Sequence, residues 1–412
     1  MSFLWYNGHI MKDIKKDFPF FKNNPGLIYG DNAATTQKPQ VVIDRMSRFY
    51  THENAPVHRG VYALAEQATT AYEAVRAQVK DFIGACDRSE IVFTPNATAG
   101  INLVARAWAQ NVLKPGDEIV LTELEHHANL VPWLQVAQAT GARVRYIPLL
   151  SNGNLDYAAL PEIINENTKI VAMTALSNVT GLVVDVEKIA AAAKKVGAAC
   201  VVDACQSILR SKIDVEASKI DFLVFSSHKA LGPAGAGVLF ARRKFHPQMT
   251  PLFGGGGAVL GVDFESMTWR SVPERYEAGT PDVQAVLGLG AALEYITKRL
   301  DRQVWKKYEE GLRETLVQGL RSMPRIKILG PIDPSIPTGG IVSFTVDGIH
   351  AHDVAAFFDK HNIAVRSGNH CAQPLHSKFG IAATVRISFC IYNSHEDVKR
   401  ILETMRLLLN EH

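Results

Sequence analysis

The sequence has little that would suit it to a membrane, an oxidising compartment or a nucleic acid. No apolar run in the 412 residues approaches the roughly 20 residues that a membrane-spanning helix needs. The formal net charge is only +3 and no basic stripe stands out, which argues against a nucleic-acid or anionic-membrane partner. Five cysteines, an odd number scattered over a long chain, do not resemble a disulfide framework. We therefore expect a cytoplasmic protein.

Short β-branched runs alternate with longer helical stretches from about residue 84 to residue 240. The runs that predict strands are Ile91–Thr94, Glu118–Thr122, Arg143–Ile147, Ile170–Thr174, Cys200–Val202, Phe222–Phe225 and Val238–Phe240. Helical stretches such as Val186–Val196 separate several of them. This alternation predicts an α/β fold with a wound, mostly parallel sheet. In such sheets, ligands bind beyond the carboxyl ends of the strands.

A second, smaller α+β unit is predicted after the four glycines at 254–257. Helical stretches over Val283–Arg299 and Arg302–Ser322 lead into it. Its predicted strands are Gly340–Val346, Ile363–Arg366 and Val385–Phe389, and its predicted helices are His352–His361 and Glu396–Leu409.

An amine and a carboxylate follow two neighbouring predicted strands. Lys229 comes after Phe222–Phe225, and Asp203 comes directly after Cys200–Val202. A pyridoxal phosphate enzyme needs both groups, a lysine that holds the aldehyde as a Schiff base and an acid that faces the pyridine nitrogen. Small residues at 232–237 would let the backbone approach a bulky ligand. Either residue alone is more often a solvated charge or a helix cap, so it is the pair that favours this cofactor.

Two other segments offer groups for the same cofactor. Asn96–Gly100 lies between the strand Ile91–Thr94 and an apolar helix, so its backbone N–H groups and the hydroxyl of Thr98 suit a phosphate. Asn and Thr are also ordinary helix caps, which is the structural alternative. Gln206 and Asn178 could reach the phenolic oxygen of the ring.

Adjacent histidines occur in the segment Glu125–Asn129. The chain has no Cys-x-x-Cys and no His-Glu-x-x-His, so we predict no metal site. A better use for His126 is to stack on the pyridine ring. The alternative is a loop histidine with a purely structural role.

A cysteine lies in the loop Arg366–Pro374, directly after a predicted strand. Arg366 and His370 flank Cys371 with positive charge, which favours the reactive thiolate. We predict that Cys371 is a nucleophile. The other cysteines are expected to be small buried hydrophobic residues; they are Cys86, Cys200, Cys205 and Cys390.

Taken together, seven motifs resemble one family. They are Val57–Gly60, Glu125–Asn129, Ser177–Asn178, Asp203–Gln206, Ser226–Lys229, Glu277–Pro281 and Arg366–Cys371. The chain is similar to SufS-type (group II) cysteine desulfurases, among the class-V aminotransferase-like enzymes that use pyridoxal 5'-phosphate. The resemblance implies the PLP-dependent transferase fold (fold type I, aspartate aminotransferase-like) and a homodimer. Residues 26–289 would form the large domain, and residues 1–25 and 290–412 the small one.

The resemblance also implies a role for each matching residue. Lys229 would form the Schiff base, His126 would stack on the ring, Asp203 would pair with the pyridinium nitrogen and Cys371 would accept sulfur. The remaining implied positions are Gln206 and Asn178 near the ring oxygen, Thr98, Ser226 and His228 at the phosphate, Thr280 at the phosphate of the other subunit, Arg386 and Asn178 at the substrate carboxylate, and Asn32 near it.

The sequence departs from many relatives at two positions. Asn369 stands where they have a histidine, and Ala97 stands where they have a second threonine. The second departure removes at most one phosphate hydrogen bond, on the order of 1 kcal/mol.

The implied reaction converts L-cysteine to L-alanine and leaves the sulfur on Cys371 as a persulfide. A thiolate suits this step because it forms sulfur–sulfur bonds readily. The implied partner is a sulfur-acceptor protein of SufE-like or SufU-like type, for iron–sulfur cluster assembly or other sulfur delivery. Two alternatives stay open: a selenocysteine lyase or other β-elimination enzyme that takes L-selenocysteine or a similar substrate, and an inactive fold that serves as a scaffold for a sulfur carrier.

Overall fold

The structure, a computed structural model, describes residues 14–411. Residues 1–13 and residue 412, which the sequence analysis assigns to the small domain, lie outside the described residues. Within the described range, no helix is both long enough and apolar enough to cross a membrane.

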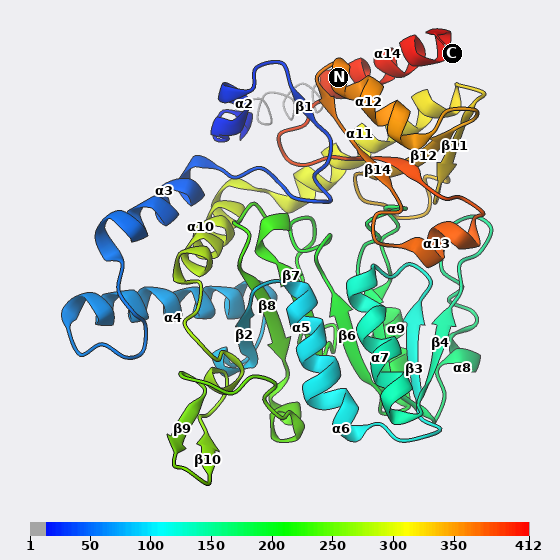
Figure 1. Cartoon of the computed structure of the whole chain (residues 1–412). Coiled ribbons are helices and arrows are strands. Elements are labelled where there is room, and N and C mark those ends of the chain that lie inside the picture. The colour runs from blue at the N-terminus through cyan, green and yellow to red at the C-terminus, as the bar shows by residue number, and fades with distance from the viewer. Residues whose placement is uncertain (1–13, 412) are drawn as a thin grey trace.

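A sheet of seven strands runs through the larger part of the molecule (Figure 1). Its strands lie in the order β2 (Ile91–Thr94), β8 (Gly237–Ala241), β7 (Phe222–Ser226), β6 (Ala199–Asp203), β5 (Thr168–Thr174), β3 (Glu118–Thr122) and β4 (Arg143–Ile147). Only β8 in this sheet runs antiparallel to its neighbours, and every other pair is parallel. The prediction of a wound, mostly parallel sheet is confirmed, and the predicted strands lie close to the observed bounds.

Both faces of this sheet are covered by helices, and its central strands β6, β7 and β8 are buried at every position. In β5, Ile170 and Ala172 face the side on which α5 (Ala97–Val104) and α7 (Val131–Thr140) pack. The alternate residues Val171 and Met173 face the other side. The helices on that side include α4 (Ala63–Ile83), α9 (Val186–Lys195) and α10 (Val283–Arg299).

A second sheet of four antiparallel strands forms the smaller unit. Its order is β11 (Ile326–Leu329), β12 (Ile341–Val346), β15 (Thr384–Ser388) and β14 (Arg366–Gly368). Helices α11 (Arg302–Arg321), α12 (Ala351–Lys360) and α14 (His395–Glu411) accompany it. The single strand predicted over Ile363–Arg366 is instead divided: β13 (Ile363–Ala364) pairs with β1 (Ile28–Tyr29), and β14 begins at Arg366.

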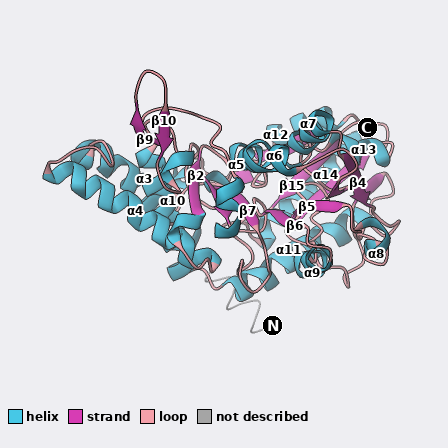
Figure 2. Cartoon of the chain, turned by 90° about the horizontal axis from the view of Figure 1, so that it is seen from below, coloured by secondary structure: helices cyan, strands magenta, loops and turns pink. Residues whose placement is uncertain are grey.

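The remaining elements extend the two units. They are α2 (Pro19–Asn23), α3 (Gln40–Arg48), α6 (Gln110–Val112), α8 (Leu160–Ile163), α13 (Gln373–Lys378), and the hairpin of β9 (Val259–Val262) and β10 (Met267–Trp269). Figure 2 shows this hairpin standing apart from the body of the molecule. Helix α13 lies above the ends of the strands of the large sheet (Figure 1), and its Lys378 pairs with Glu123. The loop between β14 and α13 contains Cys371, whose carbonyl accepts a hydrogen bond from the N–H of His127 in the large unit.

Gly237 allows β8 to pass close to the loop that precedes α5. A Cβ atom at Gly237 would lie 2.6 Å from the backbone of Asn96, which caps α5. We expect Gly237→Ala to lower the free energy of unfolding by about 1–3 kcal/mol, because the loop must move away. Gly255→Ala is the matched control, since nothing lies within 4 Å of that position. Urea denaturation measures both variants, and equal stabilities would contradict the prediction.

Candidate active site

The carboxyl ends of β5, β6 and β7 open onto a cavity of about 310 Å³ that residues of both units line. The predicted site residues that line it are Lys229, Asp203, His126, Thr98, Ser226, His228, Asn178, Arg386 and Cys371. Gln206, Asn32 and Thr280 are not among the lining residues in the described part of the chain. The structure therefore brings together groups that lie far apart in the sequence.

Lys229 and Asp203 lie at the ends of adjacent strands. Asp203 is the last residue of β6 and is buried, and its Oδ1 accepts a hydrogen bond of 2.9 Å from the backbone N–H of Cys205. Lys229 ends the short 3-10 helix that follows β7. Because β6 and β7 pair in parallel, the two side chains leave the sheet at the same edge.

His126 is a neutral imidazole in this site. Burial, and after it the charge of the nearby Lys229, lower its pKa to about 4. Its Nδ1 accepts a hydrogen bond of 3.0 Å from the N–H of Ala128, so its proton lies on Nε2. Behind it, Glu125 accepts a hydrogen bond from the N–H of Thr174, and burial raises the pKa of this carboxyl to about 8.

The N-terminus of α5 faces the cavity and suits an anion. Ser226 Oγ accepts a hydrogen bond of 2.9 Å from the N–H of Ala97, and Asn96 caps the helix by accepting from Ala99 at 2.9 Å. Thr98 presents its hydroxyl group beside them. His228 stays neutral, because burial and Lys229 lower its pKa to about 4. The donors around this helix end fit a phosphate group.

Arg386 lies almost completely buried in β15 and lines the same cavity. Its Nη1 donates to the carbonyl of Asn178 at 3.0 Å, and its Nη2 donates to Asp31 at 3.0 Å. Its Nε is buried and has no hydrogen-bond partner among the described residues. A buried guanidinium N–H requires an acceptor, and a carboxylate from a ligand would supply one.

The loop of Cys371 is held by contacts that the sequence analysis did not predict. Both His370 and Cys371 have positive φ angles, of 52° and 57°, which are unfavourable for residues with a side chain. Asn369 Oδ1 accepts from the N–H of Cys371 at 3.1 Å. His127 donates its N–H to the carbonyl of Cys371 at 2.7 Å, and its Nε2 accepts from Gln373 at 3.1 Å.

Two expectations from the sequence are wrong. His370 does not supply positive charge to Cys371, because burial and the neighbouring Arg386 lower the pKa of His370 to about 2. Cys86 is exposed, whereas a buried residue was expected. It occupies a bend after α4, where the chain leaves the core. All five cysteines are free, and Cys371 is the other exposed one.

The predicted residues outside the cavity support its walls or lie farther away. Gln206 donates to the carbonyl of Ala33, a lining residue, at 2.8 Å. Asn32 donates to the carbonyl of Ser388 at 2.6 Å and accepts from the hydroxyl of Tyr392. Thr280 lies in the loop before α10 and lines a separate hollow, which Asn96 and Thr98 also line.

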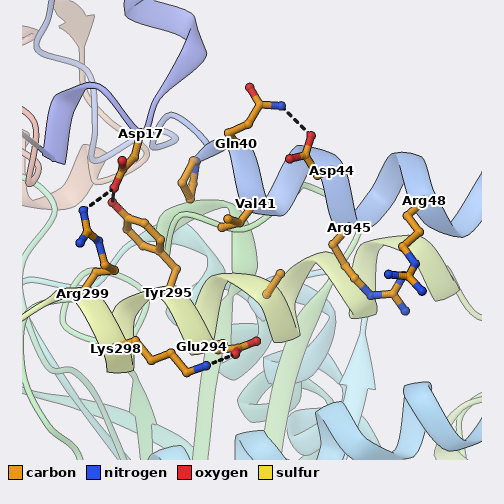
Figure 3. A pocket seen from close by; sticks show the side chains of 12 residues that line it. Asp17, Gln40, Val41, Asp44, Arg45, Arg48, Glu294, Tyr295, Lys298 and Arg299 are labelled. Atoms are coloured by element: carbon orange, nitrogen blue, oxygen red, sulfur yellow. Dashed lines mark hydrogen bonds and ion pairs between the residues drawn. The ribbon is translucent and has the colours of Figure 1, made fainter.

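A larger hollow of about 750 Å³ lies between α3 and α10 (Figure 3). Its polar side chains pair with one another, for example Lys298 with Glu294 and Asp17 with Tyr295 and Arg299. It holds none of the predicted catalytic residues. Within residues 14–411, no three His, Cys, Asp or Glu side chains are grouped so that they could hold a metal ion.

The chain belongs to the class-V aminotransferase family, which matches residues 28–401. Curated proteins that are similar to it include cysteine desulfurases. That of Pectobacterium carotovorum subsp. carotovorum (strain PC1) is 42% identical over 393 residues, which cover 94% of this chain and 95% of the relative.

Solved structures agree with this assignment. The apo cysteine desulfurase of Thermococcus onnurineus NA1 superposes with a TM-score of 0.91 at 39% identity, covering 97% of this chain and 98% of the other. The cysteine desulfurase CsdA of Escherichia coli gives 0.90 at 36% identity, with the same coverage. The predictions of a type I fold, a pyridoxal phosphate enzyme and a cysteine desulfurase are confirmed. These relatives do not single out the SufS-type group.

Because His126 is neutral, its contact with a cofactor ring is that of an aromatic face rather than of a cation. We expect His126→Phe to bind pyridoxal phosphate within about threefold of the wild-type affinity, and His126→Ala to bind it roughly tenfold more weakly. Titration of the apoprotein with the cofactor, followed by absorbance, measures both. A phenylalanine variant as weak as the alanine variant would refute this view of the ring contact.

Proposed function

We propose that the protein acts on L-cysteine, releases L-alanine and transfers the sulfur to its own Cys371. The observation that carries this proposal is that one cavity is lined by the amine of Lys229, the carboxylate of Asp203, the neutral imidazole of His126 and the thiol of Cys371. A lysine and an acid are the groups that pyridoxal phosphate needs, and the thiol is the group that sulfur transfer needs.

The cavity residues fit the cofactor group by group. Lys229 would hold its aldehyde, Asp203 would face the pyridine nitrogen and His126 would stack on the ring. The phosphate would lie at the N-terminus of α5, with the donors Thr98, Ser226 and His228. Asn178 would lie at the ring oxygen. Gln206, for which the sequence implies the same role, lies behind the cavity wall and donates to the carbonyl of Ala33. When bound, the cofactor supplies an electron sink next to the α-carbon of the substrate.

The substrate is oriented by Arg386, whose unpartnered Nε–H donates a hydrogen bond to the substrate carboxylate. Asn178 lies beside this guanidinium. Lys229 Nζ removes the proton from the α-carbon. Arg386 and Lys229 would therefore hold the amino acid in the cavity that Cys371 also lines.

The thiolate of Cys371 then attacks the substrate sulfur. A sulfur–sulfur bond forms and the bond between sulfur and the β-carbon breaks. The β-carbon keeps the electron pair and takes up a proton, which completes the methyl group of alanine. Cys371 is left as a persulfide.

Transfer of that sulfur to a second protein requires an accessible persulfide. Cys371 is exposed at the rim of the cavity, which supports direct attack by a partner group. The proposed partner is a SufE-like or SufU-like sulfur acceptor in the cytoplasm, and the proposed destination is iron–sulfur cluster assembly or another sulfur-containing product.

A homodimer is also part of the proposal. Large apolar side chains are exposed on the hairpin of β9 and β10, with relative exposures of 74% for Leu260, 72% for Val262 and 107% for Phe264. An exposed apolar patch of this kind is typical of an interaction surface. In the dimer, Thr280 of each chain would reach the phosphate in the site of the other.

The sulfur-transfer step is tested by mass spectrometry after incubation with L-cysteine and pyridoxal phosphate. We expect one added sulfur on the peptide that contains Cys371, because this thiol lines the cavity. Cys371→Ala should form no persulfide and should lower alanine release by at least about a hundredfold. Cys86→Ala removes the other exposed thiol and is the matched control, with wild-type turnover. Alanine release at the normal rate from Cys371→Ala would overturn the proposal.

The oligomeric state is tested by light scattering. We expect a molar mass near twice the 45.2 kDa of one chain. Phe264→Asp should weaken association by at least about tenfold because it places a charge on the apolar hairpin. Phe264→Leu retains an apolar side chain and serves as the control. A mass of one chain at micromolar concentration would contradict the dimer.

A further inference from the structure

A chain of three buried side chains runs behind the loop of Cys371. It joins His376 in α13, Thr384 in β15 and His370 in the loop itself. Thr384 Oγ1 lies 3.0 Å from Nε2 of His376 and 2.9 Å from Nε2 of His370. The hydroxyl group has only one proton, so Thr384 donates to one of the two ring nitrogens and accepts from the other. The tautomer of His376 decides which.

His376 fixes the first step. Its Nδ1 lies 3.0 Å from the carbonyl of Ala372, which can only accept, so Nδ1 carries the proton. Burial lowers the pKa of His376, so the ring is neutral and its Nε2 has a lone pair. This nitrogen therefore accepts the hydroxyl proton of Thr384.

The same reasoning fixes the tautomer of His370. Since Thr384 has used its only proton on His376, its oxygen accepts from Nε2–H of His370. His370 is neutral for the reasons given above, so its Nδ1 has a lone pair and no proton. The order of donation is thus His370 to Thr384 to His376 to Ala372.

This leaves one buried acceptor at the cavity. His370 lines the cavity and is only 5% exposed, and its Nδ1 has no hydrogen-bond partner in the part of the chain that is described. Arg386 lines the same cavity and carries the unpartnered Nε–H. Thr384 and Arg386 stand two residues apart in β15 and so project from the same face of the strand.

A ligand that satisfies both atoms must offer an acceptor to Arg386 and a hydrogen-bond donor to His370. This step rests on the proposed function. In L-cysteine the carboxylate is the acceptor, and the amino group is engaged with the cofactor. The donor that remains is the thiol S–H, which is the group that must come to rest beside Cys371.

We propose that Nδ1 of His370 accepts a hydrogen bond from the thiol of the substrate, and that Thr384 and His376 are positioning residues that hold His370 in the required tautomer. The bond orients the substrate sulfur next to Cys371, the residue that follows His370 in the chain. It also discriminates between substrates. A selenol is a stronger acid than a thiol and is ionised at neutral pH, so selenocysteine has no proton to donate to this nitrogen.

The test compares two substrates in two variants at one position. Thr384→Val keeps the shape of the side chain but removes the hydroxyl, so the tautomer of His370 is no longer fixed. We expect kcat/KM for L-cysteine to fall by roughly fivefold to tenfold, the value of one hydrogen bond, and kcat/KM for L-selenocysteine to fall by less than about twofold. Thr384→Ser restores the hydroxyl and should recover most of the activity toward L-cysteine. Equal losses with both substrates, or no loss with either, would overturn the proposal.

A second measurement does not depend on activity. In wild-type holoenzyme labelled with ¹⁵N-histidine, the resonances that disappear in His370→Gln identify His370. We expect its Nδ1 to show the chemical shift of an unprotonated nitrogen and its Nε2 that of a protonated one. The opposite assignment would overturn the proposal even if Thr384→Val fails to fold. Absence of alanine release by the wild-type enzyme would instead refute the proposed function, so the two failures are distinguishable.

Discussion

The buried guanidinium of Arg386 is the interaction on which the site depends. It belongs to the smaller unit, yet it donates to Asn178 of the loop after β5 and to Asp31 near the start of the described chain. A buried charge is tolerated only when it is well paired, so these contacts fix the smaller unit against the edge of the large sheet. The cavity exists because that contact brings β15 and the loop of Cys371 over the strand ends that carry Lys229 and Asp203.

Desolvation gives the three histidines of the cavity the same protonation state. Burial is the largest cause of the lowered pKa of His126, His228 and His370, and a neighbouring cation, Lys229 or Arg386, is the next. All three rings are therefore neutral, and each offers one donor and one acceptor whose places are set by its hydrogen bonds. The positive charge of the cavity comes from lysine and arginine alone, which suits a site that must hold a phosphate and a carboxylate.

The sequence was sufficient for the strands and for the groups at their ends, but not for the contacts that hold the Cys371 loop. Runs of apolar residues predict strands locally, and the parallel order places Asp203 and Lys229 at one edge without further information. The partners of the loop lie far away: His127 and Gln373 are separated by 246 residues. No local pattern distinguishes His127 from a solvated histidine. The same limit explains why the charge of His370 was wrongly predicted, because that charge depends on burial by residues from both units.

The backbone of the loop shows why so many distant contacts meet there. His370 and Cys371 both adopt the left-handed conformation, which costs of order 1–3 kcal/mol for each residue and persists only where the surroundings enforce it. Asn369 and His127 enforce it through the backbone of Cys371, and Thr384 enforces it through the ring of His370. The turn that results leaves the ring of His370 buried and the thiol of the next residue exposed. Adjacent residues thus serve opposite needs, because the acceptor for the substrate must exclude water while the sulfur must remain within reach of a second protein.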